Sequence, residues 1–552
     1  MVGARFNLTL VLHREQTYRR RVFARSANDV VPRAGSMHSL SQTLRTFTWL
    51  SVAVLTGCYV ATLIQYSPLA FTDYPAHIAR ATVLQDLIYD SGLHFRRIFT
   101  FHPAPIPYLL GDLFLATAIH FWGISLGSGV WVSLVLLSLP AALLLYMRAH
   151  DVKVEDYSLV VLVSLYLATD WFFVMGFLSF RLAVAITILT LAIAAHLRTH
   201  WSWLMYLGYV VAVVLGYLTH LATLLFIAVG ASVSGLLRLH LGKTYLRNEA
   251  WLIVPIALIV CWHFGVATTY TLPGDPSENP YTWGTATGKI VRLGSEFLRF
   301  SKRGDLSLFL AFVGCLLLCL MTRPARDGRM LEWAALATAY VGLYVVLPIG
   351  YSEAWFVDVR PLALVSVFAL LTCAAAPSVG SARATRITSL ATMSALLLAA
   401  GNLGYLIHHL SPLDTRLRQY RDVVARLPHG SHVLPIYTCC TQGSLRPLLH
   451  ASSFITIDRQ GLTPYEFAAE TANPEKYFRY IKLPYRPEET WYMPPDKSVN
   501  WNSVSKDYDY LLITKPFEPS RIRLPVQLIA ENDGAALVAI DRARLRRAAL
   551  DR

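Results

Sequence analysis

Charged residues are scarce in this chain of 552 residues. Asp, Glu, Lys and Arg together make up 15% of it, well below the roughly 25% of a soluble domain. This scarcity argues against a soluble protein and agrees with a hydrophobic fraction of 55% and a mean hydropathy of +0.44. The formal net charge of +14 does not indicate nucleic-acid binding. Much of the excess lies in the N-terminal segment and in short loops, where basic residues mark the cytoplasmic side of a membrane protein.

Cysteine is scarce as well, with seven residues in all. Five lie in apolar runs, where cysteine behaves as a small hydrophobic side chain, and Cys439 and Cys440 are adjacent. No Cys-x-x-Cys pair occurs, so the usual spacing of a structural zinc site is missing. Free thiols, or one partner elsewhere, are expected for the adjacent pair rather than a strained vicinal disulfide.

Long apolar runs dominate what is present. Several reach the roughly 18 residues that cross a bilayer, and we expect a polytopic α-helical membrane protein with about eleven transmembrane helices. With these spans nearly every basic short loop lies on one side, which predicts a cytoplasmic N-terminus and a C-terminus on the outer side. The expected spans are residues 47–66, 130–147, 157–174, 180–197, 203–220, 221–239, 251–270, 306–321, 331–349, 361–376 and 387–407.

Three regions differ in composition. Residues 1–45 form a basic arm expected in the cytoplasm, residues 46–407 form the transmembrane domain, and residues 408–552 are rich in Pro, Tyr and charge. The last region predicts a small α/β domain outside the membrane, on the periplasmic side. Residues 67–126 are interpreted as an outer loop. The surface helices expected in it are 75–91 and 106–122. In the C-terminal region we expect a helix over 416–427 and strands over 432–437, 454–458, 510–514 and 535–541.

Residues 73–80, DYPAHIAR, place an acid, an imidazole and a guanidinium just after the first span. If a helix begins near Pro75, His77 and Arg80 lie one turn apart and Asp73 sits at its N-terminus. Two interpretations are open at this point. Asp73 either caps the helix and nothing more, or the three side chains form a site at the membrane surface.

Further polar residues are expected at the same outer face, namely Asp170, His220, Glu353 and Arg360. Charged groups near the membrane usually face a cavity or a partner. An arginine and acids on one leaflet suit a lipid phosphate, since arginine binds the phosphate and an acid handles a proton. Structural roles stay open. Asp170 and Glu353 could be solvated loop acids, and His220 could make a structural hydrogen bond. Arg360 could reach headgroups or pair with Asp358.

This layout resembles the GT-C superfamily of membrane glycosyltransferases, which includes protein O-mannosyltransferases, aminoarabinose transferases and oligosaccharyltransferase catalytic subunits. Its members share an acid and juxtamembrane helices in the first outer loop, a second acid after span three, and often a C-terminal domain outside the membrane. Residues 72–77 (TDYPAH) match the first acid, 103–108 (PAPIPY) the start of the second juxtamembrane helix, and 168–170 (ATD) the second acid. The resemblance covers residues 46–407.

The resemblance implies transfer of a sugar from a polyprenyl-phosphate donor to a glycan, lipid or protein acceptor. The reaction would take place at the outer face of the cytoplasmic (inner) membrane and invert the anomeric carbon. Asp73 would act as general base, and Arg360, with Arg80 or His77, would hold the leaving phosphate. The implied catalytic residues are Asp73 and Asp170, and the substrate-binding residues are His77, Arg80, His220, Glu353 and Arg360.

No cofactor is certain from the sequence. A divalent cation is possible but is not supported, because Asp170 has no second acid near it in the sequence. Two other functions stay open, a transporter or flippase for lipid-linked saccharides and a non-catalytic assembly protein. Transporters often contain inverted repeats and polar groups at the bilayer midplane, whereas no repeat is visible here and the polar residues gather at one face.

Overall fold

The structure is a computed structural model of the whole chain. It describes residues 34–90, 92–93, 95–101, 105–152, 157–242, 244–265, 281–321, 328–351, 354–374, 382–437, 445–464, 478–480, 499–515, 520 and 522–550. Most of the N-terminal arm, Glu353, Cys439 and Cys440 lie outside the described residues. Residues 52–552 form one compact unit, and the site lies within it.

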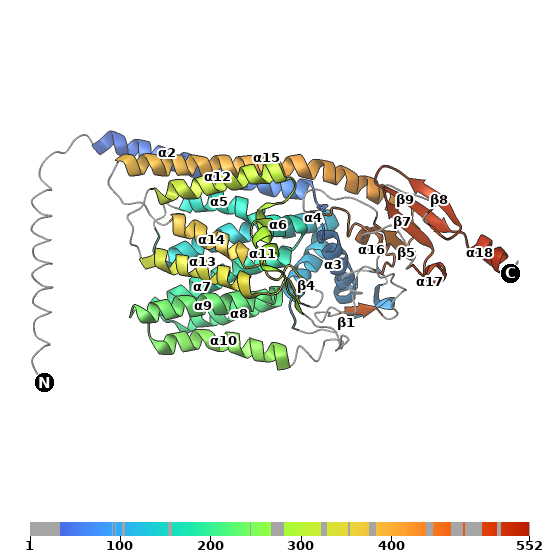
Figure 1. Cartoon of the computed structure of the whole chain (residues 1–552), viewed down its shortest axis with the longest axis horizontal. Helices are drawn as coiled ribbons and strands as arrows, with labels where there is room; N and C mark the ends of the chain where they lie inside the picture. Colours follow the sequence, from blue (N-terminus) through green and yellow to red (C-terminus); the bar gives the residue numbers. More distant parts are fainter. Residues whose placement is uncertain are drawn as a thin grey trace, which may run out of the picture. The chain divides into compact units, whose positions relative to one another are not determined.

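The described part of each expected span is largely helical, which confirms a polytopic helical membrane protein. Within the described residues, eight helical segments are long and apolar enough to cross a membrane, and α8 and α14 are shorter apolar helices. Figure 1 shows α7, α9, α13 and α14 side by side. The helices on the expected spans are α2 (Ala34–Gln65), α4 (Leu109–Ala149), α5 (Tyr157–Ala168), α7 (Leu178–Thr199), α8 (Trp203–Thr219), α9 (Ala222–His240), α10 (Leu246–Gly265), α12 (Lys302–Leu320), α13 (Gly328–Val346), α14 (Leu362–Ala374) and α15 (Ala382–Val424).

Residues 67–126, which the sequence predicts to be an outer loop, contain the two expected helices. The first is α3 (Tyr74–Tyr89). The second is the beginning of α4, which is interrupted at Gly123, where φ is 75° and ψ is 171°. The parts before and after this break pack closely, because a Cβ on Gly127 would lie only 2.6 Å from the carbonyl oxygen of Ala118. Only glycine allows that approach.

The long helix α15 leads to the C-terminal α/β domain (Figure 1). Its four-stranded sheet has the order β5-β7-β9-β8, in which β5 (Val433–Ile436) and β7 (Tyr510–Thr514) are parallel. The strand β9 (Ala535–Ile540) is antiparallel to both β7 and β8 (Val526–Glu531). Buried side chains such as Leu511 form the core of this domain. The helix expected over 416–427 is the end of α15 rather than a separate element.

One predicted strand is wrong. Residues 454–458 lie in a helix, α16 (Ser453–Arg459), whose first five residues are buried. A short apolar run does not distinguish a buried helix from a strand, and here the packing of α16 against α3 decides. The strand β8 was not predicted from the sequence. It is largely exposed, and its pairing with β9 has an irregular register between Leu528 and Ala530.

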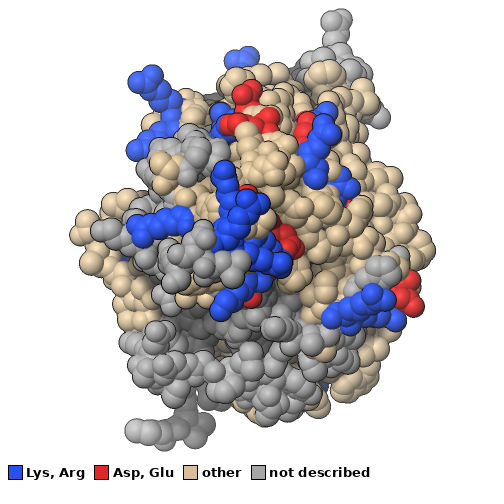
Figure 2. All heavy atoms as spheres, turned by 90° about the vertical axis from the view of Figure 1, so that its right-hand side faces the viewer, with Lys and Arg blue, Asp and Glu red and all other residues tan. Residues whose placement is uncertain are grey.

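Short elements complete the described chain. The strand β1 pairs antiparallel with β6 from the C-terminal region. Figure 2 looks onto the right-hand side of Figure 1 and shows more blue surface (Lys, Arg) than red surface (Asp, Glu) among the residues that are not grey. The arginine-rich α18 belongs to this end of the chain. The remaining elements are η1 (Phe95–Arg97), β1 (Phe99–Phe101), α6 (Trp171–Met175), β2 (Tyr281–Thr282), α11 (Ala286–Arg292), η4 (Ser295–Phe297), β3 (Gly350–Tyr351), β4 (Ala354–Trp355), β6 (Phe478–Tyr480), α17 (Trp501–Asp507) and α18 (Arg542–Leu550).

Candidate functional site

Asp73 stands at the N-terminus of α3, as expected, but its side chain makes no capping hydrogen bond. The interpretation that it only caps the helix is therefore wrong. Its backbone N–H donates to the carbonyl oxygen of Met175 over 2.9 Å, and its carboxylate Oδ1 lies 3.5 Å from Nε2 of His450. The side chain is 17% exposed, so the carboxylate is accessible at its edge while its backbone is fixed.

His77 and Arg80 contact each other on the first turns of α3. The Arg80 Nη2 lies 3.1 Å from Nδ1 of His77, and since a guanidinium only donates, this ring nitrogen accepts. Burial and then the Arg80 charge lower the pKa of His77 well below its usual value, so the imidazole is neutral near pH 7. Arg80 also pairs with Asp112, with Nε 2.6 Å from Oδ2.

Tyr108 links this cluster to the two other basic residues expected at the site. The Arg80 guanidinium lies 5.8 Å from the centre of the Tyr108 ring, and the Tyr108 hydroxyl lies 3.0 Å from Nε2 of His220. The Arg360 Nη1 lies 2.8 Å from the same His220 nitrogen. Of the seven residues predicted from the sequence, four thus belong to one continuous set of side-chain contacts, namely His77, Arg80, His220 and Arg360. Asp73 joins this set through its backbone, because its carbonyl oxygen accepts from the His77 N–H over 3.2 Å.

The imidazole of His220 faces N–H donors at both ring nitrogens. Its Nδ1 accepts from the backbone N–H of Ala222 over 3.1 Å, so in this tautomer Nε2 carries the hydrogen and can donate to the Tyr108 hydroxyl. The Arg360 Nη1 lies 2.8 Å from Nε2, which leaves no room for an atom between the two nitrogens, so an anion would bind beside this pair. Burial and the Arg360 charge lower the pKa of His220 well below its usual value, which keeps the ring neutral.

Asp170 is buried, so the interpretation as a solvated loop acid is wrong. It is the N-cap of α6, where its Oδ1 accepts from the backbone N–H of Phe173 over 3.1 Å. Its Oδ2 lies 2.8 Å from Nη1 of Arg181. Arg181 is 3% exposed and donates also to the carbonyl oxygen of Leu167. Both acids of the sequence prediction therefore lie at α6, with Asp170 at its start and Asp73 bonded to its end.

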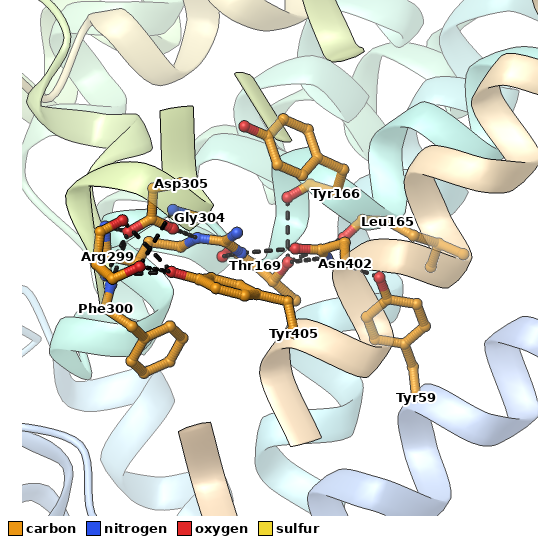
Figure 3. Close-up of polar contacts among 11 residues, drawn as sticks. Tyr59, Leu165, Tyr166, Thr169, Arg299, Phe300, Gly304, Asp305, Asn402 and Tyr405 are labelled. Atoms are coloured by element: carbon orange, nitrogen blue, oxygen red, sulfur yellow. Dashed lines mark hydrogen bonds and ion pairs between the residues drawn. The ribbon is translucent and has the colours of Figure 1, made fainter. Parts of the chain in front are cut away.

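A buried network that the sequence analysis missed fixes the residue before Asp170 (Figure 3). Arg299 donates to the carbonyl oxygen of Thr169 over 2.9 Å and to Oδ1 of Asn402 over 2.7 Å. Asp305 pairs with Arg299 at 3.1 Å. Asn402 in turn donates to Tyr59 and to the Thr169 hydroxyl. Arg299 and Asp305 lie between the expected spans 251–270 and 306–321, and no motif there predicts this role.

Glu296 is a second acid that the sequence analysis missed. It is 2% exposed and accepts a hydrogen bond from Ser366. Burial raises the pKa of Glu296 to about 8, and the nearby negative charge of Asp170 adds to this effect. Asp170, alone in its part of the sequence, thus has an acid near it in space. Among the described residues, however, no group of three or more His, Cys, Asp or Glu side chains could hold a metal ion.

Two further expectations concern the loop before α14. Asp358 pairs with Arg292, with 3.0 Å between Oδ2 and Nη2, while Arg360 contacts His220 as described above. Glu353 lies outside the described residues. No sequence pattern predicts a role for His450, because its neighbours in the sequence do not distinguish it from the other histidines of the chain.

Comparisons with known proteins identify the fold. Neither family models nor curated protein sequences match the chain. The crystal structure of ArnT from Cupriavidus metallidurans in the apo state matches with a TM-score of 0.50 and 12% identity, over 90% of this chain and 98% of that chain. ArnT bound to undecaprenyl phosphate has a TM-score of 0.47, with the same identity and coverage. The arabinofuranosyltransferase AftD from Mycobacteria has a TM-score of 0.48 at 12% identity, over 90% of this chain and 40% of that chain.

The match to apo ArnT shows that the two chains share a fold. It confirms the helical membrane architecture with a small C-terminal domain that the GT-C resemblance implied.

Proposed function

We propose that the protein is a membrane glycosyltransferase that moves a sugar from a polyprenyl-phosphate donor to an acceptor hydroxyl. The reaction takes place at the outer face of the cytoplasmic membrane, with the N-terminus inside and the C-terminal domain on the periplasmic side. The observation that carries the proposal is the contact of the Arg360 guanidinium with His220, with 2.8 Å between Nη1 and Nε2. A phosphate oxygen beside this pair accepts from the guanidinium.

The phosphate leaves from this position. The bond between the anomeric carbon and the phosphate oxygen breaks, and its electron pair stays on the phosphate. Arg360 stabilises the charge that develops there, which is the kind of interaction that lowers a transition state most. The His220 Nε2–H and the Tyr108 hydroxyl are the neighbouring donors.

Asp73 acts as the general base. It takes the proton of the acceptor hydroxyl while the hydroxyl oxygen bonds to the anomeric carbon on the face opposite the phosphate, so the configuration inverts. Its missing cap bond and its partial exposure support this role. Arg80 pairs with Asp112 and orients His77 beside the base. The proposed substrate-binding residues are His77, Arg80, His220, Glu353 and Arg360.

A donor panel tests the proposal. Purified protein in nanodiscs would be incubated with undecaprenyl-phosphate-linked mannose, aminoarabinose and arabinofuranose, with a cell-envelope extract as the source of acceptors. We expect release of free undecaprenyl phosphate from at least one donor, and the same rate when a metal chelator is added. No release from any donor by folded protein would contradict the proposal and favour a transport or assembly role.

A further inference from the structure

The C-terminal domain contacts the proposed base directly. His450, just before α16, is 5% exposed, and its Nε2 lies 3.5 Å from Oδ1 of Asp73. A second contact comes four residues earlier, where the backbone N–H of Arg446 donates to Oγ1 of Thr72 over 3.3 Å. The helix α16 also packs against α3. Together these contacts join the C-terminal domain to the segment that carries Asp73.

We propose that His450 is a positioning residue for Asp73, an inference that rests on the proposed function. The Asp73 carboxylate makes no bond to the N-terminus of its own helix, so its orientation depends on other donors. An Nε2–H of His450 directed at Oδ1 holds that oxygen in place, and Oδ2 takes the proton of the acceptor. The separation of 3.5 Å is long for a hydrogen bond, and contacts of this kind often shorten when substrate binds.

This assignment gives the C-terminal domain a part in the chemistry. Without His450 the backbone N–H of Asp73 still donates to Met175, but the carboxylate loses a contact that holds its rotamer. A misplacement of about 1 Å in a reacting group can cost about 100-fold in rate. The loss is in turnover, because His450 faces the base and not the Arg360–His220 pair that binds the phosphate.

Three variants of the full-length protein in nanodiscs test the assignment, with the donor of the panel that the wild type cleaves fastest. His450→Ala removes the donor group, and His450→Gln keeps a side-chain N–H. His429→Ala is the matched control, since His429 is an exposed histidine of the same domain that contacts Arg459.

We expect His450→Ala to lower kcat by about 100-fold with the donor KM within threefold of wild type. His450→Gln recovers a substantial part of this loss, and His429→Ala behaves like wild type. A kcat for His450→Ala within twofold of wild type overturns the assignment. So does an equal loss in both His450 variants that follows a common fall in Tm. Absence of turnover in the wild type overturns the proposed function, and the positioning role with it.

Discussion

Asp73 donates its backbone N–H to the carbonyl oxygen of Met175, the last residue of α6, over 2.9 Å. Asp170 caps the other end of the same helix. A helix of five residues is about 7.5 Å long, so one short rigid element relates the two acids. The buried network around Arg299 and the Asp170–Arg181 pair fix its beginning, and the segment that carries Asp73 bonds to its end.

Gly176 makes this junction possible, and we expect Gly176→Ala to displace the Asp73 loop. Its φ is +91°, and a Cβ would lie 2.6 Å from the backbone nitrogen of Tyr74. A shift of about 1 Å at Asp73 predicts a loss of about 100-fold in kcat, measured as release of polyprenyl phosphate. Gly92→Ala is the control, because Gly92 has φ +76° but nothing within 4 Å. Equal kcat values for the two variants would show that the junction does not position the base.

The proposed contribution of Asp170 to catalysis is to hold α6. Asp170→Asn leaves the buried Arg181 charge unpaired, which typically costs about 3–5 kcal/mol, so we expect Tm and activity to fall together. The double variant Asp170→Asn with Arg181→Met removes that charge and should regain most of the Tm. As a control, Asp414→Asn breaks a pair with Arg418, whose side chain is 69% exposed, and should change stability by no more than about 1 kcal/mol. A double variant that is as unstable as Asp170→Asn would contradict this view.

Glu296 predicts a pH dependence of stability with a definite sign. Its pKa is about 8 in the folded protein and close to 4.5 when unfolded. Between these values the folded state binds the proton that the unfolded state has lost, so stability falls as pH rises. We expect Glu296→Gln to raise Tm relative to wild type by an amount that grows from about pH 5 to pH 8 and then levels off. Thermal unfolding at several pH values checks this, and a constant difference would mean that Glu296 titrates normally.

Arg360 is expected to govern donor binding. Arg360→Ala removes a charged donor worth about 1.5–3 kcal/mol, so the donor KM should rise roughly 10- to 100-fold. Arg360→Lys keeps the positive charge but lacks the planar set of guanidinium donors. Its donor KM should lie between those of wild type and Arg360→Ala. Arg418→Ala, at an exposed position with its partner Asp414, controls for loss of positive charge. An effect confined to the acceptor KM would move the phosphate site elsewhere.

Much of the architecture could be predicted from the sequence because it depends on local patterns. Apolar runs of bilayer length locate the helices, and the spacing of His77 and Arg80 after Pro75 predicts the polar face of α3. The contacts that build the site are not local. His450 and Asp73 are 377 positions apart in the sequence, yet their side chains are in contact. No pattern of residue spacing predicts a contact at that separation.

The interior polar residues show the same limit. Glu296 and Asp170 are far apart in the sequence, and only the packing of η4 against α6 brings them close. The run 454–458 has the composition of a strand, yet tertiary packing makes it a helix. Sequence patterns report which face of an element is buried, but they do not report what it is buried against.

The most direct test of the account compares Asp73→Asn with wild type and with Asp90→Asn. Asn keeps the shape of Asp but cannot take a proton, while Asp90, at the far end of α3, has a side chain that is 72% exposed. We predict that Asp73→Asn lowers release of polyprenyl phosphate by about 100- to 10,000-fold at unchanged Tm, and that Asp90→Asn keeps the wild-type rate. Turnover by folded Asp73→Asn at the wild-type rate would contradict the assignment of Asp73 as the base.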